Sequence, residues 1–387
     1  MDQAVSAGRA RRRIDLALQG GGSHGAFTWG VLDRLLEEDD LEISGISGTS
    51  AGALNAGVLV TGLARGGPPQ GRQALHDFWR DVSVSGQIFS PFPAHGRPPG
   101  GNFNFDQLPA YQWMNVFWRS FSPYEFNPLN LNPLRDVVRR HVDASVLKNC
   151  HRAAPRVHLF ITATSVRTGQ AHVFTGDELS EDALLASACL PFMFQAVEID
   201  GEPYWDGGYV GNPAIFPLIY QTDALDVLLV KLNPLRREGT PRRSVEIIDR
   251  LSEITFNTSL MAEMRAIAFV SRLLREHRLD PGRYKDLRMH MIADDAGLLP
   301  FNASSKFNTD WGFLQKLCEL GRSAADRWLR EHKADLGVRS SLDIEREFLA
   351  KPLREEMAPV KARQQRPRTR SRRLIDGVKR LLGRRRT

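Results

Sequence analysis

In the first sixty or so residues, short apolar runs alternate with stretches whose apolar residues recur at helical spacing. Residues 14–19 (IDLALQ) form a short apolar run that ends in glycines, which is typical of a buried parallel strand. Residues 26–38 carry apolar side chains at helical spacing. Residues 43–47 predict a second strand and residues 51–63 a second helix. Strand, helix, strand and helix in this order indicate an α/β fold with a parallel sheet.

Similar patterns predict the elements of the remaining chain. Predicted helices cover residues 133–146, 181–188, 213–220, 243–278 and 309–334. Predicted strands cover residues 157–166, 170–174, 226–232 and 287–292, with a hairpin over residues 198–204 that turns on Asp200-Gly201. We therefore expect a three-layer α/β/α domain with a mixed sheet over residues 10–235. A mainly helical extension packed on it over residues 236–360 and a tail over residues 361–387 complete the expected organisation.

Residues 65–132 interrupt the regular pattern with a Pro- and Gly-rich stretch that is also rich in aromatic side chains. Between Phe78 and Phe126 lie 13 of the 33 aromatic residues of the chain. A disordered linker is poor in aromatic residues, so we expect this insertion to be ordered. Two interpretations stay open, namely a satellite hydrophobic cluster under long loops, and a lid or acyl-binding wall.

The net charge of +7 is concentrated in the tail. Residues 361–387 contain 12 Lys or Arg and one acidic residue, so the rest of the chain is mildly acidic. Within residues 371–386 the apolar residues fall on one helical face and the basic residues on the others, a pattern typical of a helix that lies on an anionic membrane. A solvated charge run and a nucleic-acid tail are the competing interpretations. We favour the membrane, because charge alone needs no apolar stripe, and expect no specific nucleic acid partner.

The composition favours a reduced, cytoplasmic protein that associates peripherally with the inner membrane surface. Cys150, Cys189 and Cys318 are widely spaced and show no disulfide or metal-ligand pattern. The basic N-terminus is followed by too short an apolar run for a signal peptide, and no apolar stretch is long enough to span a bilayer. We expect no metal site and no cofactor. The sequence does not indicate an oligomeric state.

A first glycine motif follows the first predicted strand. It comprises Gly20, Gly21, Gly22, Ser23, His24 and Gly25 and leads into a predicted helix. Glycines in such a loop let backbone N–H groups converge on an anion, and the helix N-terminus adds a favourable dipole. The loop therefore suits a phosphate or the oxyanion of a tetrahedral intermediate, and the motif alone does not distinguish them.

A second motif, Gly48-Thr49-Ser50-Ala51-Gly52, fits G-x-S-x-G between a predicted strand and a predicted helix. In that setting a strained turn exposes the serine hydroxyl at the carboxyl edge of the sheet. The alternative is a glycine-rich turn in which Ser50 only caps the helix. Because both glycine motifs follow adjacent predicted strands, where α/β sheets bind ligands, we interpret Ser50 as a nucleophile.

A nucleophilic serine needs a base, and Asp206 is the candidate. It precedes Gly207 and Gly208 after the predicted hairpin. An Asp followed by two glycines is by itself more often a simple turn. Together with the two earlier motifs, we interpret Asp206 as the base.

The three motifs together resemble those of the patatin-like phospholipases. LALQGGGSHGAF is similar to the oxyanion loop of that family, GTSAG to its nucleophile elbow and WDGGY to its D-G-[GA] motif. ASACLPFMF resembles the segment that precedes the family's catalytic Asp, and the resemblance covers about residues 14–220. It implies a Ser50–Asp206 dyad without histidine and an acyl-enzyme formed from a lipid ester. It also implies an oxyanion site made by the amides of residues 20–25.

The glycine loop departs from the resemblance at His24, where the family usually has Arg or Lys. A mostly neutral imidazole weakens any role as a fixed positive charge. Two interpretations stay open: a histidine tolerated at a loop position, and a group that lowers activity above its own pKa.

Three other functions are compatible with parts of the sequence. A dinucleotide-binding oxidoreductase is suggested by Gly20, Gly22 and Gly25 with Glu42, although Glu42 falls at the start of its strand and not at the end. An ordinary α/β-hydrolase triad requires a late histidine, and the candidates are His277, His290 and His332. A lipid-binding scaffold without activity is the third.

Overall fold

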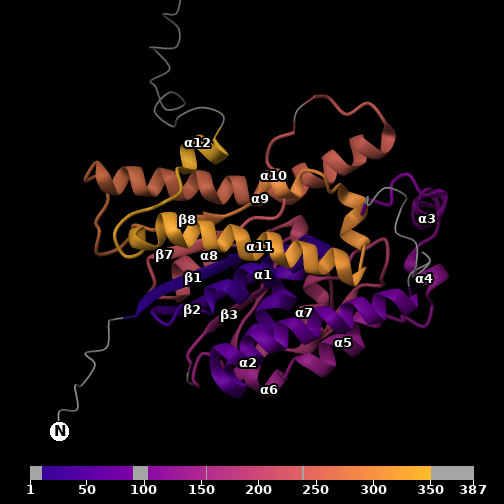
Figure 1. The fold of residues 1–387 in the computed structure, drawn as a ribbon, viewed down its shortest axis with the longest axis horizontal. Helices are drawn as coiled ribbons and strands as arrows, with labels where there is room; N and C mark the ends of the chain where they lie inside the picture. Colours follow the sequence, from indigo (N-terminus) through magenta and orange to yellow (C-terminus); the bar gives the residue numbers. More distant parts are fainter. Residues whose placement is uncertain (1–10, 90–102, 154, 238, 350–387) are drawn as a thin grey trace, which may run out of the picture.

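The computed structural model describes residues 11–89, 103–153, 155–237 and 239–349 (Figure 1). The predicted tail, residues 361–387, and its amphipathic stretch at 371–386 lie outside the described residues.

A mixed sheet of eight strands forms the centre of the described part of the chain. Its strands are β1 Arg12–Leu18, β2 Leu41–Thr49, β3 His158–Ser165, β4 Ala171–Phe174, β5 Val197–Ile199, β6 Glu202–Asp206, β7 Asp226–Val230 and β8 Arg288–Ile292. The order is β5-β6-β3-β2-β1-β7-β8, and β4 also pairs with β3. β3, β2, β1, β7 and β8 are parallel, whereas β4 and β6 run antiparallel to β3. The mixed sheet expected from the sequence is thus confirmed.

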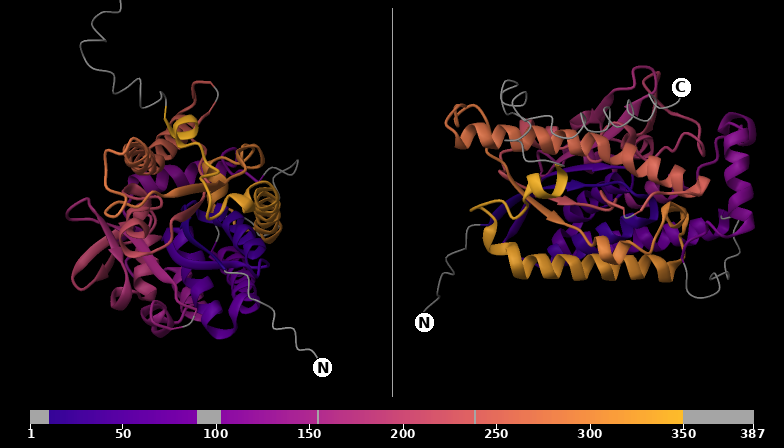
Figure 2. Two further views of the ribbon diagram at one scale, coloured as in Figure 1. Left: turned by 90° about the vertical axis from the view of Figure 1, so that its left-hand side faces the viewer. Right: turned by 90° about the horizontal axis from the view of Figure 1, so that it is seen from above.

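Helices cover both faces of the sheet (Figure 2). In β7, Leu228 and Val230 join the larger hydrophobic core, while Val227 and Leu229 join a second core on the opposite face. The first face carries α1 Gly25–Leu35, α2 Ala51–Phe89, α5 Pro133–His141, α6 Ala144–Asn149, α7 Glu181–Ser187 and α11 Trp311–His332. The second carries α8 Phe216–Gln221, α9 Ser244–Arg275 and α12 Ile344–Phe348. Strands buried on both faces explain why the central runs are apolar throughout, and the expected three-layer architecture is confirmed.

The short helices lie mostly in the connections. They are η1 Gly22–His24, α3 Pro109–Ser120, α4 Pro123–Phe126, η2 Gly176–Glu178, η3 Gly207–Tyr209, α10 Asp295–Leu298, η4 Ala303–Phe307 and η5 Lys333–Asp335. The predicted hairpin turn is present, because Asp200 and Gly201 both adopt positive φ between β5 and β6.

The insertion is more helical than its composition suggests. α2 continues to Phe89, although the chain bends at Gly66 and Gly67, where φ and ψ are not helical. Pro68 and Pro69 follow the bend directly. Proline is tolerated in the first turn of a helix, so these residues begin a second helical segment and do not end the structure. α3 and α4 then form part of the aromatic-rich stretch.

Residues beyond 235 contribute to the same sheet and core. β8 pairs in parallel with β7, and α11 packs along α1 with their backbones in close contact. A Cβ atom added at Gly321 of α11 would lie 2.0 Å from the carbonyl oxygen of Phe27. A Cβ atom at Gly30 of α1 would lie 1.9 Å from the carbonyl oxygen of Cys318. The two helices can therefore approach this closely only because glycines face each other's backbones.

Among the described residues, no helix is both long and apolar enough to cross a membrane.

Gly321→Ala tests the contact between α1 and α11. In a helix interior, alanine is more favourable than glycine by about 1 kcal/mol. The added methyl group has no space against the Phe27 carbonyl, so we expect a net decrease of about 2 kcal/mol in the free energy of unfolding, measured by urea denaturation. The exposed Ser323→Ala on the same helix is the control. A Gly321→Ala protein as stable as this control would contradict the backbone contact.

Candidate active site

Ser50 lies at the turn between β2 and α2. Its φ of 54° is in the left-handed region, which costs free energy for a residue other than glycine. The turn is tight at both of its glycines. A Cβ atom at Gly52 would lie 2.2 Å from the carbonyl oxygen of Leu18. A Cβ atom at Gly48 would lie 2.7 Å from the carbonyl oxygen of Gly52. The G-x-S-x-G pattern therefore has a steric reason at both glycines, and its serine is partly exposed.

Asp206 reaches the same point of the sheet along the edge of β3 that β2 occupies. Thr49 pairs with Thr162 of β3, and Asp206 at the end of β6 pairs with the next residue, Ala163. Because β4 pairs with the opposite edge of β3, β2 and β6 meet end to end on one edge, and their register places the residue before Ser50 next to the carboxyl-bearing residue.

Ser187 of α7 connects this segment of β3 to the turn. Its hydroxyl group donates to the carbonyl oxygen of Thr162 at 2.6 Å and accepts the backbone N–H of Ser50 at 2.9 Å. Gly207 completes the junction, because a Cβ atom there would lie 2.1 Å from the same Thr162 oxygen. The backbone at Ser50 is therefore held by hydrogen bonding from a helix that packs on β3.

The Asp206 side chain is buried, with 2% of the residue exposed. Burial raises the pKa of Asp206 to about 6, although a hydrogen bond from the Gly208 N–H, the nearby Ser50 hydroxyl and the charge of Lys306 each lower it. The Gly208 N–H lies 2.7 Å from the carboxyl Oδ1. A carboxyl group with a raised pKa is a stronger base than an exposed aspartate and is still mostly ionised at pH 7.

The glycine loop lies directly beside Ser50. A Cβ atom at Gly20 would lie 2.7 Å from the Cβ atom of Ser50, so only glycine fits there. The Gly20 N–H is bonded to Asn212 Oδ1 at 2.6 Å, and the amides of His24 and Gly25 bond within the loop. Among the described residues, the amides of Gly21, Gly22 and Ser23 have no hydrogen-bond acceptor. These three amides are the donors that the loop has available for an anion.

His24 is buried beneath the loop. Its Nε2 atom lies 2.7 Å from Ser305 Oγ, and its ring packs edge-on against Phe301 and Phe313. Burial lowers the pKa of His24 to about 3, and the positive charges of Lys306 and Arg237 add to the effect. The imidazole is therefore neutral from pH 5.5 to 8, so the structure gives no basis for a loss of activity above the His24 pKa in that range.

Sequence reasoning missed the polar residues that hold the loop. Gln19 is fully buried and accepts the backbone N–H groups of Leu232 and Asn233 at 2.7 and 2.8 Å, which fixes the end of β1 to the chain after β7. Asn233 donates to the Gly20 carbonyl oxygen at 2.9 Å. Asparagines outside a motif carry no sequence signal of this kind, because only the fold brings them to the loop.

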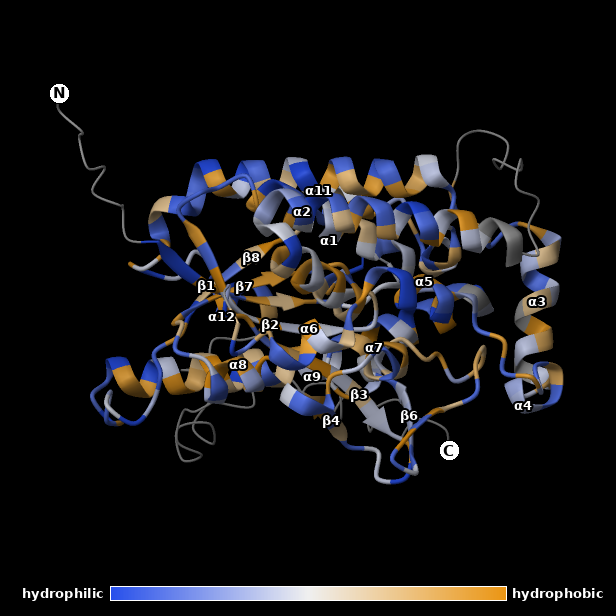
Figure 3. Cartoon of the chain, turned by 90° about the horizontal axis from the view of Figure 1, so that it is seen from below, coloured by the Kyte–Doolittle hydropathy of each residue, from blue (hydrophilic) through white to orange (hydrophobic). Residues whose placement is uncertain are grey.

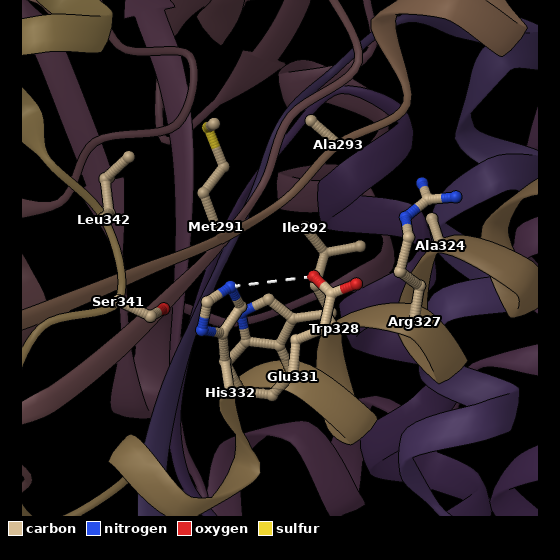
Figure 4. A pocket seen from close by; sticks show the side chains of 10 residues that line it. All are labelled: Met291, Ile292, Ala293, Ala324, Arg327, Trp328, Glu331, His332, Ser341 and Leu342. Carbon is tan, nitrogen blue, oxygen red and sulfur yellow. Dashed lines mark ion pairs between the residues drawn. The ribbon is translucent and has the colours of Figure 1, made fainter.

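The residues of the rival functions lie elsewhere. Glu42 is at the start of β2, where it pairs with Arg13 at 3.6 Å, and not at the strand's carboxyl end. His277 is exposed just after α9. His332 lies in a cavity of about 180 Å³ that β8, α11 and residues 341–342 enclose (Figure 4), and it contacts Glu331 and Asp335.

His290 is the only one of these histidines in a Ser–His–Asp chain among the described residues. Its Nδ1 atom lies 2.9 Å from Ser341 Oγ, and its Nε2 atom lies 3.0 Å from Asp226 Oδ1. Asp226 begins β7 and also binds Arg288 and the Gly337 N–H. The chain links the 337–341 segment to the β7–β8 edge of the sheet and includes no residue of the Ser50 turn.

No group of three or more His, Cys, Asp or Glu side chains within the described ranges is arranged to hold a metal ion. The three cysteines are buried and unbridged.

Comparison with known families identifies the family of the chain. Residues 16–219 match the patatin-like phospholipase family, which is more than half of the chain. The protein belongs to this family. The match contains the glycine loop, the Ser50 turn and Asp206, and it ends within α8. The matched residues do not include β7, β8, α9 and α11.

Solved structures that match the chain include VipD from Legionella pneumophila, with 13% sequence identity and a TM-score of 0.39 over 88% of this chain and 73% of that one. Another is ExoU in its complex with SpcU, from the type III secretion system of Pseudomonas aeruginosa. It shows 17% identity and a TM-score of 0.39, and the alignment covers 88% of this chain and 58% of that one. No curated protein sequence matches the chain.

The raised pKa of Asp206 predicts how the reactivity of Ser50 depends on pH. As the expected base of Ser50, Asp206 has to be ionised, so the rate at which Ser50 reacts with a fluorophosphonate should decrease as pH falls through about 6. Neutral His24 adds no second step between pH 5.5 and 8. Labelling rates across this range measure both points. A rate that does not change with pH, or one that decreases above pH 7, would contradict this assignment of charge states.

Proposed function

We propose that the protein is a serine acyl-ester hydrolase of the phospholipase A, lysophospholipase or esterase type that uses Ser50 as nucleophile and Asp206 as base. The observation that carries this proposal is the junction at β3, where β2 and β6 meet end to end on one edge and bring together a serine in a strained turn and a buried carboxyl group with a raised pKa. The family supports lipid acyl hydrolysis as the general activity.

The proposed reaction proceeds through an acyl-enzyme. Asp206 accepts the hydroxyl proton of Ser50 while the Ser50 oxygen attacks the ester carbonyl. The free amides of the glycine loop stabilise the oxyanion, and the C–O bond to the alcohol breaks as Asp206 returns the proton to that alcohol. Water then attacks the acyl group, Asp206 takes the water proton and passes it to Ser50, and the fatty acid leaves. The step uses no metal and no cofactor.

Exposed apolar side chains on α3 and in the connections beside it support a substrate that lies in a lipid phase. α3 turns Tyr111 and Trp118 towards Phe307, which directly follows Lys306. The other side of α3 is open to solvent, where Trp113 is 76% exposed and Val116 is 57% exposed. Figure 3 shows hydrophobic residues along α3 and in nearby connections. Side chains exposed by more than 40% here are Phe117, Phe121, Tyr124, Leu129, Leu131 and Phe192.

An apolar surface of this kind is unusual in a protein that meets only water. Trp and Phe are favoured where a protein inserts into a membrane interface. We propose that α3 and its neighbours contact the lipid surface, which is one form of the lid or wall suggested by the insertion. The anionic membrane remains a proposed partner of residues 371–386 on the sequence pattern alone.

Fluorophosphonate labelling tests the nucleophile and its base. We expect wild-type protein to be labelled at Ser50, Ser50→Ala to be unlabelled, and Asp206→Asn to be labelled at least about a hundred times more slowly, because the general base is lost. Peptide mass spectrometry locates the label. Ser341→Ala is the matched control, because Ser341 is bonded to His290 but lies away from the Ser50 turn, and this variant should react like wild type.

Labelling of Ser341 in place of Ser50 would contradict the proposal. Absence of label on wild-type protein, even with anionic phospholipid vesicles present, would favour a lipid-binding protein without hydrolase activity.

Substitution on α3 tests the lipid-facing surface. Trp113→Ala combined with Phe117→Ala should lower hydrolysis of phospholipid vesicles by about tenfold, because apolar area that binds the interface is lost. Hydrolysis of a soluble short-chain ester should stay unchanged, since neither side chain is part of the proposed dyad. Val338→Ala is the control: this residue is 72% exposed and follows η5, which contacts Arg12 at the start of β1. Equal losses on both substrates would refute the interfacial role.

A further inference from the structure

A lysine that comes from outside the matched family region lies between the two loops of the candidate active site. Lys306 is in η4, more than 80 residues beyond the end of the match at residue 219. Its Nζ atom donates to Asn233 Oδ1 at 2.7 Å, and Asn233 in turn donates to the Gly20 carbonyl oxygen at 2.9 Å. One asparagine therefore separates the ammonium group from the glycine loop.

The backbone of Lys306 also contacts the loop. A Cβ atom at Gly22 would lie 2.6 Å from the Lys306 carbonyl oxygen. Gly22 also has a φ of 59°, a conformation that residues with a side chain rarely adopt. Both the backbone conformation and the lack of space therefore require glycine at this position. η4 thus packs directly on the loop whose free amides are proposed to bind the oxyanion.

On its other side, Lys306 approaches the Asp206 loop. The Nζ atom lies 6.0 Å from the centre of the Phe256 ring of α9. Phe256 packs on Gly208, where an added Cβ atom would lie 2.4 Å from the ring, and its ring centre is 5.3 Å from that of Tyr209. A single side chain therefore lies between the glycine loop and the residues that follow Asp206.

The positive charge of Lys306 is not neutralised by a close partner. Among the described residues, no carboxylate lies within 4.0 Å of its Nζ atom. Glu253, the carboxylate with most influence on Lys306, is already bonded to Arg237 at 2.7 Å and to Arg250 at 3.0 Å. An unpaired ammonium group in a half-buried position acts on its surroundings more strongly than one in water.

We propose that Lys306 is a positioning residue that holds the glycine loop through Asn233 and supplies the positive charge that favours the carboxylate form of Asp206. The inference rests on the proposed dyad. The glycine loop itself offers no such charge, because its one titratable residue, His24, is neutral.

The charged and titratable groups around the pair are compatible with this role. Burial lowers the pKa of Lys306, whereas the carboxylates of Glu253, Asp249 and Asp206 raise it. Burial raises the pKa of Asp249 to about 6, and the charge of Lys306 acts to lower it.

The titratable groups around Asp206 are the thiol of Cys189 and the hydroxyl of Tyr209. Burial, and to a smaller extent Asp206, raises the pKa of each to about 12, so both are neutral at pH 7. The remaining groups that act on Lys306 or Asp206 are Arg237, Gly208 and Ser50.

Three substitutions separate the charge from the hydrogen bond. Lys306→Gln keeps a donor for Asn233 and removes the charge, Lys306→Arg keeps the charge at every pH used, and Lys306→Met removes both. Lys316→Met is the control, because Lys316 is an exposed lysine on α11 that lies over Phe103 and Phe301. Each protein is first checked for folding by its thermal transition.

Two measurements follow the protonation of Asp206. One is the pH dependence of fluorophosphonate labelling at Ser50. The other is an infrared titration of the Asp206 carboxyl group, assigned by difference from Asp206→Asn, which needs no activity. We expect Lys306→Gln and Lys306→Met to raise both midpoints by about one pH unit, since an opposite charge has been removed. At pH 6 their labelling should be several-fold slower than wild type, and Lys306→Arg and Lys316→Met should keep the wild-type midpoint.

A decrease in labelling of the same size at every pH, without a shift of either midpoint, would mean that Lys306 is only structural and would overturn the proposal. An unshifted midpoint in Lys306→Gln would do the same even if Lys306→Met failed to fold. If wild-type protein neither labels nor hydrolyses esters, the proposed function fails separately. The infrared midpoint of Lys306→Gln still decides the role of Lys306 in that case.

Discussion

The backbone at Thr162 of β3 is the constraint on which the whole site depends. It pairs with Thr49, and its neighbour Ala163 pairs with Asp206 along the same edge of β3. The carbonyl oxygen of Thr162 accepts a hydrogen bond from Ser187, which also holds the Ser50 N–H. A shift of one residue in the register of β2 or β6 along β3 would turn the side chains of that strand to the opposite faces and change the spacing between the serine and the carboxyl group. The proposed chemistry therefore depends on the order and register of three strands.

The chain beyond residue 219 completes both the fold and the site. β8 and α11 enlarge the sheet and core on the family domain, and the glycine contacts between α1 and α11 hold the helix that follows the glycine loop. The same region contributes Asn233 and Lys306, which contact the loop from outside. Burial of His24 beneath the loop leaves its imidazole neutral, so positive charge near Asp206 has to come from another segment. We infer that the C-terminal half has a part in the chemistry as well as in stability.

Local patterns in the sequence predicted most of the fold. Apolar runs, helical spacing and the Asp200-Gly201 turn each act over a few residues, so they located the strands and the long helices α9 and α11. The G-x-S-x-G motif reflects one local backbone contact, between Gly48 and Gly52, and one with Leu18 of the neighbouring strand. The helix after Pro68-Pro69 was missed, because two prolines that usually end a helix here begin one. Lys306 and Asn233 were also missed, since contacts across 73 residues or more leave no periodic signal.

The central claim is that an ester is cleaved through a covalent intermediate on Ser50. The most direct measurement is mass spectrometry of protein quenched in acid during turnover of a slowly hydrolysed fatty acyl ester. The account predicts an acyl group on the peptide that contains Ser50, which disappears as the ester is used up and is absent from Ser50→Ala. Release of fatty acid by wild-type protein with no acyl group on any residue at any quench time would contradict it, because water would then attack the ester directly.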